Sequence, residues 1–546
     1  MEKDNRELPS SKDMHVLSQK TDYVIGQDNI QIYGLDVHNP VFAMSAALVL
    51  IFSSLALAFP ETSTSILVES RDLILDLFDT LFSLSIIALT CFILFLIISP
   101  FGRIRIGGEN AKTEFKFISW VCMLFSAGVG IGMTFYGAAE PLAYFTGIYG
   151  TPLGVKAETP EAYRLAFSAT LFHWGISGWS VYALIGLSIG FFTFNRGLPL
   201  TIRSIFYPLL GERVWGWPGH IIDIVAVLST LFGLATSLGL GAQQVSSGLN
   251  YLFNIPKNHQ MQSLIIISIS CLAIYSVVRG LDNGVRKLSN INIGMAICLM
   301  LFIILAGPTK TIVFSYSDNL ANYFVDMFSL SALDRQEDKQ WYHDWTIFYW
   351  AWWISWSPFV GIFIARISKG RTVREFLTVV MSAPLLFSLI WFSSFGATAI
   401  SQYEANIGSL PNNTGEMSLV LFLMLENLVF PIISSIFALA LLVFFFVTSS
   451  DSGSLVVDSI TSGGKLNAPK PQRIFWASVQ GLLAIVLLIG GGSSALGAIQ
   501  AGAISMALPF VIILLAASIS LTIGLYSELS DLNKKTLLKE SDAYEK

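Results

Sequence analysis

The stretch from Thr346 to Arg366 constrains the fold of this chain more than any other. Its sequence, TIFYWAWWISWSPFVGIFIAR, is long and apolar enough to cross a bilayer as a helix. Anchoring tryptophans gather at one end of a membrane helix, but here Trp352, Trp353 and Trp356 continue toward the middle and share a helical face by spacing. Indole faces attract cations, quaternary ammonium groups above all. The pattern predicts an indole-lined surface inside the membrane, while Trp350 fits an anchoring or packing role equally well.

Two stretches predict interrupted helices. Ser357-Pro358 follows the tryptophans, and because proline lacks an N–H and clashes with the preceding turn, the helix should kink or open there. In GVGIG, the alternate residues Gly128, Gly130 and Gly132 line up on no single helical face. They predict an unwound segment in which bare backbone approaches a ligand or an ion.

Composition places both breaks in a polytopic membrane protein. The 546 residues are 53% hydrophobic and only 13% charged, whereas soluble domains carry about 25% charged residues. About twelve apolar spans predict an all-α transmembrane domain over residues 40–526, between an N-terminal tail (1–39) and a C-terminal tail (527–546). The two breaks are five spans apart, which predicts two five-helix inverted repeats, about 116–307 and 346–526, after two additional N-terminal helices. Paired breaks of this kind indicate a transport site near the membrane midplane.

The predicted loops differ in charge between the two sides. The loops that share a side with the termini carry 17 lysine and arginine residues, and the opposite loops carry 7. Because cytoplasmic loops hold the excess of positive charge, both termini are expected in the cytoplasm.

The fourth predicted span adds aromatic residues that can face the same cavity. Trp179 and Tyr182 are three residues apart, and Trp174 lies about one and a half turns earlier. Beside them, His173 is read as a hydrogen-bonded structural residue rather than a proton relay. Glu140, near the predicted edge of the third span, is read as a structural or gating residue rather than a substrate ligand.

Adjacent hydroxyls near the end of the tenth span suggest an ion site. Thr448 and Ser449 lie in an otherwise apolar helix. Such hydroxyls often bond back to the preceding turn, but they can also join carbonyls of an unwound helix around sodium, and we favour this second interpretation.

These motifs closely resemble those of the betaine/carnitine/choline transporter family. WAWWISWSPFVGIFIARISKGRTVREF matches the signature region of the family, GVGIGMTFYGAAEP is similar to its third-span glycine motif, and FHWGISGWSVY to its fourth-span aromatic residues. The resemblance spans about residues 39–526. It implies a leucine-transporter-like fold with two additional N-terminal helices, a homotrimer in the membrane lipid, and secondary uptake of trimethylammonium compounds, commonly driven by sodium. A prokaryotic inner (cell) membrane is the expected location.

The resemblance also implies roles for individual residues. It assigns Trp174, Trp179, Tyr182 and Trp353 to an aromatic box, and Trp352 and Trp356 to the access path or a second site. Independently of the resemblance, the bare backbone of the unwound stretch, at Gly128, Val129, Gly130 and Gly132, is expected to bind the substrate. For sodium the resemblance implies the backbone of Ser126, Val129 and Phe445 with the hydroxyls of Thr448 and Ser449. Val129 stands where family members often carry methionine. At a second sodium site, Thr230 matches one family hydroxyl but Leu234 replaces the other.

Several functions remain open from the sequence. We expect a sodium-coupled importer of a zwitterionic betaine such as glycine betaine, because every position from Ser126 to Ala139 is neutral and choline would bring an uncompensated charge. On this ground glycine betaine is expected to outcompete choline by at least about tenfold. The alternatives are a carnitine/γ-butyrobetaine exchanger, a proton-coupled choline importer, a dimethylsulfoniopropionate importer and a non-transporting ligand sensor. Neither a nucleic-acid patch nor an enzyme motif is expected, and no cofactor beyond the coupling Na⁺.

Overall fold

Most of the described chain is helical. The computed structural model describes residues 21–128, 130–279, 285–465, 467–490 and 495–544. The first half of the helices comprises α1 (Val41–Ala58), α2 (Pro60–Ile98), α3 (Phe117–Gly128), α4 (Ile131–Thr146), α5 (Pro160–Trp174), α6 (Ile176–Phe194), α7 (Tyr207–Leu210), α8 (Trp217–Phe253) and α9 (His259–Arg279). The second half comprises α10 (Val285–Ala306), α11 (Thr309–Ser331), α12 (Lys339–Trp341), α13 (Phe348–Ile367), α14 (Val373–Glu404), α15 (Met417–Glu426), α16 (Pro431–Thr461), α17 (Lys470–Gly490) and α18 (Ala495–Tyr544). Two short strands, β1 (Asn29–Ile32) and β2 (Leu35–His38), form an antiparallel hairpin before α1.

Ten helical segments of the described chain are long and apolar enough to cross a membrane. The number rises to eleven if α10 and α11, which are bent by 113° at residues 307–308, form one span. The predicted third span is not among them because it consists of α3, with 12 residues, and α4, with 16 residues, on either side of a break. A count of twelve spans and the inverted repeats therefore stay predictions. The sequence analysis missed α11 and α15 altogether.

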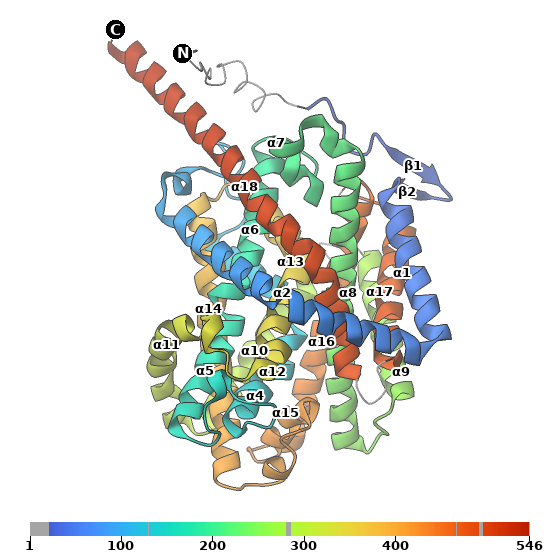
Figure 1. Cartoon of the computed structure of the whole chain (residues 1–546), viewed down its shortest axis with the longest axis vertical. Helices are drawn as coiled ribbons and strands as arrows, with labels where there is room; N and C mark the ends of the chain where they lie inside the picture. Colours follow the sequence, from blue (N-terminus) through green and yellow to red (C-terminus); the bar gives the residue numbers. More distant parts are fainter. Residues whose placement is uncertain (1–20, 129, 280–284, 466, 491–494, 545–546) are drawn as a thin grey trace, which may run out of the picture.

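The helices that carry the tryptophan cluster form the interior of the molecule. The most apolar part of the segment Lys339–Ile367, which contains α13, is 94% buried, so these tryptophans do not face lipid. The helices α6, α8 and α18 all pack against α13. The long helices α2 and α18 contact each other and cross the molecule obliquely, and α1 and α11 lie at its periphery (Figure 1).

The predicted opening of the helix at Pro358 is wrong. Helix α13 continues from Phe348 to Ile367 with Pro358 inside it. Proline cannot donate to the carbonyl of Ile354, but the Ser357 hydroxyl donates to that carbonyl at 2.7 Å. Because the carbonyl keeps a donor, the helix does not need to open. The irregular part of this segment is instead a π-helical turn, Tyr342–Ile347, directly before α13.

Part of the N-terminal tail is structured. The β1–β2 hairpin turns at Tyr33-Gly34, where both residues have positive φ, the arrangement that favours two-residue hairpins. Asp36 in β2 forms an ion pair of 2.6 Å with Lys465, which follows α16. The hairpin and the C-terminal part of α18 lie toward the same end of the molecule (Figure 1).

His38 at the end of this hairpin contacts a buried arginine. Arg203 Nη1 donates to His38 Nε2 at 3.0 Å, and Arg203 is itself paired with Asp223 and donates to the Tyr23 hydroxyl. Since arginine only donates, His38 Nε2 must carry a lone pair, and the ring must be neutral. Burial, then the charge of Arg203 and the neighbouring His220, lower the pKa of His38 from 6.5 to about 3.

We therefore predict that the hairpin detaches as the pH falls. The pKa of His38 is about 3 when the hairpin is docked and 6.5 when the ring is exposed. Its full contribution to the free energy of docking is therefore present above pH 6.5. Each pH unit below that value removes up to ~1.4 kcal/mol. A nitroxide label at Tyr33→Cys, on an almost fully exposed position, should become more mobile between pH 7.5 and pH 5. The His38→Gln variant cannot be protonated at this position and should show a smaller pH-dependent step. Equal mobility of the label at both pH values in the unmodified hairpin would contradict the prediction.

Candidate functional site

The break between α3 and α4 brings backbone next to side chains of other helices. Helix α3 ends at Gly128 and α4 begins at Ile131, with Gly130 in an extended conformation between them. A Cβ on Gly132 would lie 2.7 Å from ring atoms of both Trp174 and Trp352, so only glycine permits this approach. The interrupted third span was therefore predicted correctly. Val129 lies outside the described residues, as does the side chain of Ser126.

The break leaves a helix N-terminus inside the protein. The first turn of α4 has backbone N–H groups without partners in its own helix. Such N–H groups and the helix dipole attract negative charge. Gly130 and Gly132, on either side of the first residue of α4, both line a cavity. This cavity therefore has an end that suits an anion.

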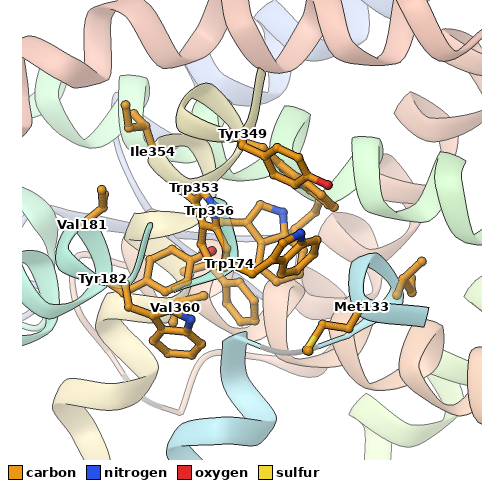
Figure 2. Close-up of a cluster of buried hydrophobic side chains, with 14 of the residues drawn as sticks. Met133, Trp174, Val181, Tyr182, Tyr349, Trp353, Ile354, Trp356 and Val360 are labelled. Atoms are coloured by element: carbon orange, nitrogen blue, oxygen red, sulfur yellow. The ribbon is translucent and has the colours of Figure 1, made fainter. Parts of the chain in front are cut away.

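The other walls of the cavity are aromatic. The side chains that line it are Trp174, Tyr182, Trp352, Trp353 and Trp356, which we call the aromatic cage. The Trp174 ring lies edge-on to Trp353, with centroids 5.7 Å apart, and Tyr182 lies edge-on to Trp353 at 5.0 Å. Trp352 and Trp356 meet at 6.3 Å in the same way. Figure 2 shows the labelled rings of Trp174, Tyr182, Trp353 and Trp356 converging from different helices. Spacing predicted that the fourth-span rings can face the same cavity as the tryptophan cluster, whereas the resemblance assigned Trp352 and Trp356 to the access path or a second site.

A second break in the chain positions Trp174. This residue ends α5, and α6 begins at Ile176 after Gly175. A Cβ on Gly175 would lie 2.4 Å from the Leu171 carbonyl oxygen. The sequence analysis treated the fourth span as one uninterrupted helix and missed this break.

Two predicted residues take other positions. Trp179 does not line the cavity and packs behind Tyr182 and Trp353, with ring centroids at 5.3 Å and 6.0 Å. Trp350 is buried against Phe172 and His173, so it packs inside the protein and is no anchor.

The indole N–H groups fix the orientation of the rings. Trp353 donates to the carbonyl of His173 at 2.9 Å, and Trp352 donates to the Ser237 hydroxyl at 3.2 Å. Trp174 donates to Glu140 Oε2 at 2.9 Å. The buried N–H of Trp356 has no hydrogen-bond partner among the described residues. It is an unused donor on the wall of the cavity.

Glu140 lies deeper than the sequence indicated. Its side chain is completely buried and also accepts hydrogen bonds from Tyr144 and Tyr349, and His173 Nδ1 lies 3.2 Å from its Oε1. His173 is a hydrogen-bonded residue, as expected, with its Nε2 3.0 Å from the Thr346 hydroxyl. The spacing of Tyr349, three residues before Trp352, could have shown that it shares a face with the tryptophan cluster.

The predicted ion-site residues of α16 lie beside the same break. A Cβ on Gly130 would lie 3.3 Å from Ser449 Oγ, which places this hydroxyl at the interruption. The Thr448 hydroxyl donates to the Phe444 carbonyl at 2.7 Å and lies 2.6 Å from Asn292 Nδ2. Thr448 thus bonds back to the preceding turn, which is the interpretation that the sequence analysis weighed against an ion site. Its oxygen keeps one further lone pair, since a hydroxyl has two acceptor positions. Phe445 is buried on the same helix.

These features define a multi-span membrane protein with a buried aromatic chamber, and comparison with known proteins gives its family. The model of the betaine/carnitine/choline transporter family matches residues 40–530. Glycine betaine transporter 1 of Vibrio parahaemolyticus is 51% identical over 93% of this chain and 97% of its own length. A glycine betaine/proline/choline/ectoine transporter of the same organism is 49% identical over 93% of this chain and 91% of its own length. Glycine betaine transporter OpuD of Bacillus subtilis is 41% identical over 90% of this chain and 95% of its own length.

The chain therefore belongs to the betaine/carnitine/choline family of transporters, and it is a bacterial-type membrane transporter rather than an enzyme. The family resemblance drawn from its motifs is confirmed.

We predict that Gly132→Ala dismantles the cage. The added Cβ would overlap two indole rings, and such overpacking typically costs about 1–3 kcal/mol. The affinity for glycine betaine, measured by binding of labelled compound to purified protein, should fall by about tenfold or more. Gly294→Ala is the matched control, because a Cβ at that helical position meets no atom within 4 Å. Unchanged affinity in Gly132→Ala would show that the rings do not form the site.

Proposed function

We propose that the protein imports a zwitterionic quaternary ammonium compatible solute, glycine betaine or a close analogue, by alternating access. The observation that carries this proposal is an aromatic cage that ends at a helix N-terminus. A trimethylammonium group fits among indole faces, which attract it electrostatically. A carboxylate fits against the first turn of α4, where N–H groups are free.

The indole of Trp356 suits the carboxylate end. Its N–H is buried without a partner among the described residues, and an unsatisfied buried donor costs about 1–3 kcal/mol. A substrate carboxylate that accepts this hydrogen bond would remove that cost. None of the described residues that line the cavity has a charged side chain, so a substrate with its own pair of charges fits it better than a bare cation.

The size of the cavity supports a mechanism in which the cage opens and closes. Its volume is about 20 Å³, which holds roughly one water molecule. A betaine is larger than water, so its entry requires the aromatic rings or their helices to move. The glycine-bounded break beside the cage and Gly175 at the start of α6 are positions where helices can move relative to each other.

We further propose that sodium drives uptake. The ligands would be the backbone of Ser126, Val129 and Phe445 and the hydroxyls of Thr448 and Ser449. The position of Ser449 beside Gly130 supports this assignment, because an ion there would share the break with the substrate carboxylate. Transporters commonly use carbonyls of unwound helices for this purpose.

We place both termini in the cytoplasm. The loops expected on the cytoplasmic side contact one another: Arg105 donates to the Gly370 carbonyl, and the N-terminal hairpin pairs with Lys465. These contacts favour a single basic face of the molecule, as the positive-inside rule requires.

Choline import is the second candidate. One relative at 49% identity is a glycine betaine/proline/choline/ectoine transporter, so a cage of this type can serve more than one substrate in the family. The deciding experiment is uptake of labelled glycine betaine, choline and carnitine into proteoliposomes, with gradients of sodium, potassium or protons. The proposal requires glycine betaine uptake that depends on sodium. Binding without flux would indicate a sensor instead.

Loss of one indole face should weaken the cage. Each cation–π contact contributes roughly 0.5–2 kcal/mol, so Trp353→Leu should lower the affinity for glycine betaine about tenfold or more, and Trp353→Phe less. Apparent affinity is measured from the concentration dependence of uptake. Trp217→Leu, at an exposed tryptophan outside the cage, is the control and should behave as the unmodified protein. The cage assignment fails if a correctly folded Trp353→Leu variant keeps its affinity.

Removal of the two hydroxyls should weaken sodium activation first. The Thr448→Ala/Ser449→Ala variant should need about tenfold more sodium for half-maximal uptake. By linkage, its betaine affinity at fixed sodium should fall as well, because each ligand raises the affinity for the other by the same factor. Thr398→Ala is the control, since that buried hydroxyl only bonds to the Ser394 carbonyl. An unchanged sodium dependence in the double variant would refute the ion site.

A further inference from the structure

Glu140 is a buried carboxylate that neutral groups surround. Its Oε1 lies 3.1 Å from the Tyr144 hydroxyl and 3.2 Å from His173 Nδ1, and its Oε2 lies 2.9 Å from Trp174 Nε1 and also accepts from the Tyr349 hydroxyl. No lysine or arginine of the described residues forms an ion pair with it. Three of these contacts come from O–H or N–H groups that donate to the carboxylate, and His173 Nδ1 lies 3.2 Å from both Oε1 and the Tyr144 hydroxyl. Donors of this kind suit the charged form of a carboxylate.

Trp174 connects this carboxylate to the cavity. Its ring lines the aromatic cage, and its N–H points away from the cavity to Glu140. An N–H that donates to an anion is polarised, which increases the electron density of the ring. A ring with greater electron density attracts a cation more strongly. The negative charge behind the ring adds a direct attraction, which is stronger in a site without water than in solution.

We propose that Glu140 is a positioning residue that sets the selectivity of the cage between cationic and zwitterionic substrates, acting through Trp174. This inference rests on the proposed function. The negative charge of Glu140 attracts the ammonium group of every substrate, but it repels the carboxylate of a betaine. For choline only the attraction remains. The neutral lining favours betaines over bare cations. The carboxylate of Glu140, behind the Trp174 ring, partly offsets this preference, so that the cage can also bind a bare cation.

The test compares two ligands in the same variant. Glycine betaine and choline share the trimethylammonium group and differ in the carboxylate. Their dissociation constants are measured by competition with labelled glycine betaine on purified full-length protein. In Glu140→Gln, the affinity for choline should fall at least tenfold more than the affinity for glycine betaine. A purely structural defect would weaken both ligands by the same factor, so an unchanged ratio in folded protein overturns the proposal.

Two further variants keep the test decisive. Glu140→Asp retains the charge and should return the ratio toward that of the unmodified protein. Trp174→Phe keeps an aromatic face but removes the N–H, and it should shift the ratio in the direction of Glu140→Gln, which provides a test if the latter does not fold. A wild-type ratio in Trp174→Phe would count against transmission through the indole.

The result also separates this inference from the proposed function. If the unmodified protein binds neither compound, the proposed function fails. If it binds them and Trp353→Leu weakens both, while Glu140→Gln leaves their ratio unchanged, the proposed function stands and the role of Glu140 is refuted.

Discussion

The break between α3 and α4 is the constraint on which the rest of the site depends. Inside a membrane protein, backbone polar groups outside a helix are tolerated only where protein or a cavity satisfies them. Here the break is covered by indole rings that come so close to Gly132 that a Cβ would collide with two of them. The same break brings Ser449 to Gly130. The glycines, the rings and the hydroxyl therefore depend on one another, because each occupies space that the others leave open.

Proline and glycine act differently in the three helices around the cage. At Gly175 the chain separates α5 from α6, and the Tyr323 hydroxyl of α11 accepts a hydrogen bond of 3.3 Å from the N–H of Ile176. At Pro358 the chain stays helical because the Ser357 hydroxyl replaces the missing donor. The amino-terminal half of the site is thus built from interrupted helices, while α13 presents its tryptophans from a continuous one. A continuous helix fixes the relative positions of Trp352, Trp353 and Trp356, so the rings can act as one surface.

The sequence was sufficient for the cage and insufficient for its surroundings. Spacings of three and four residues place Trp352, Trp353 and Trp356 on one face of any helix, so their convergence could be predicted. The interruption of the helix at Gly130 and Gly132 could also be predicted, since few other arrangements explain alternate glycines in an apolar span. Whether the helix opens at Pro358 depends on a single side-chain hydrogen bond, which residue spacing does not reveal. Spacing predicted that Trp179 faces the cage, but in the structure Tyr182 packs against it. This arrangement depends on side-chain packing, which spacing does not reveal. Helix α11 was missed because its residues are only weakly apolar.

The burial of Glu140 follows from what a transport site has to do. A carboxylate in direct contact with the ammonium group would form an ion pair of low solvation, and breaking such a pair is costly. A site that carries its ligand across a membrane needs binding strong enough for entry and weak enough for release. Trp174 stands between Glu140 and the cavity, so the charge acts at a distance and through a polarisable ring. Tyr144 and Tyr349 donate hydrogen bonds to this carboxylate from within the protein, and His173 Nδ1 lies beside it. The charge that helps to attract the ligand thus has its own partners, and it is not left unpaired when the ligand departs.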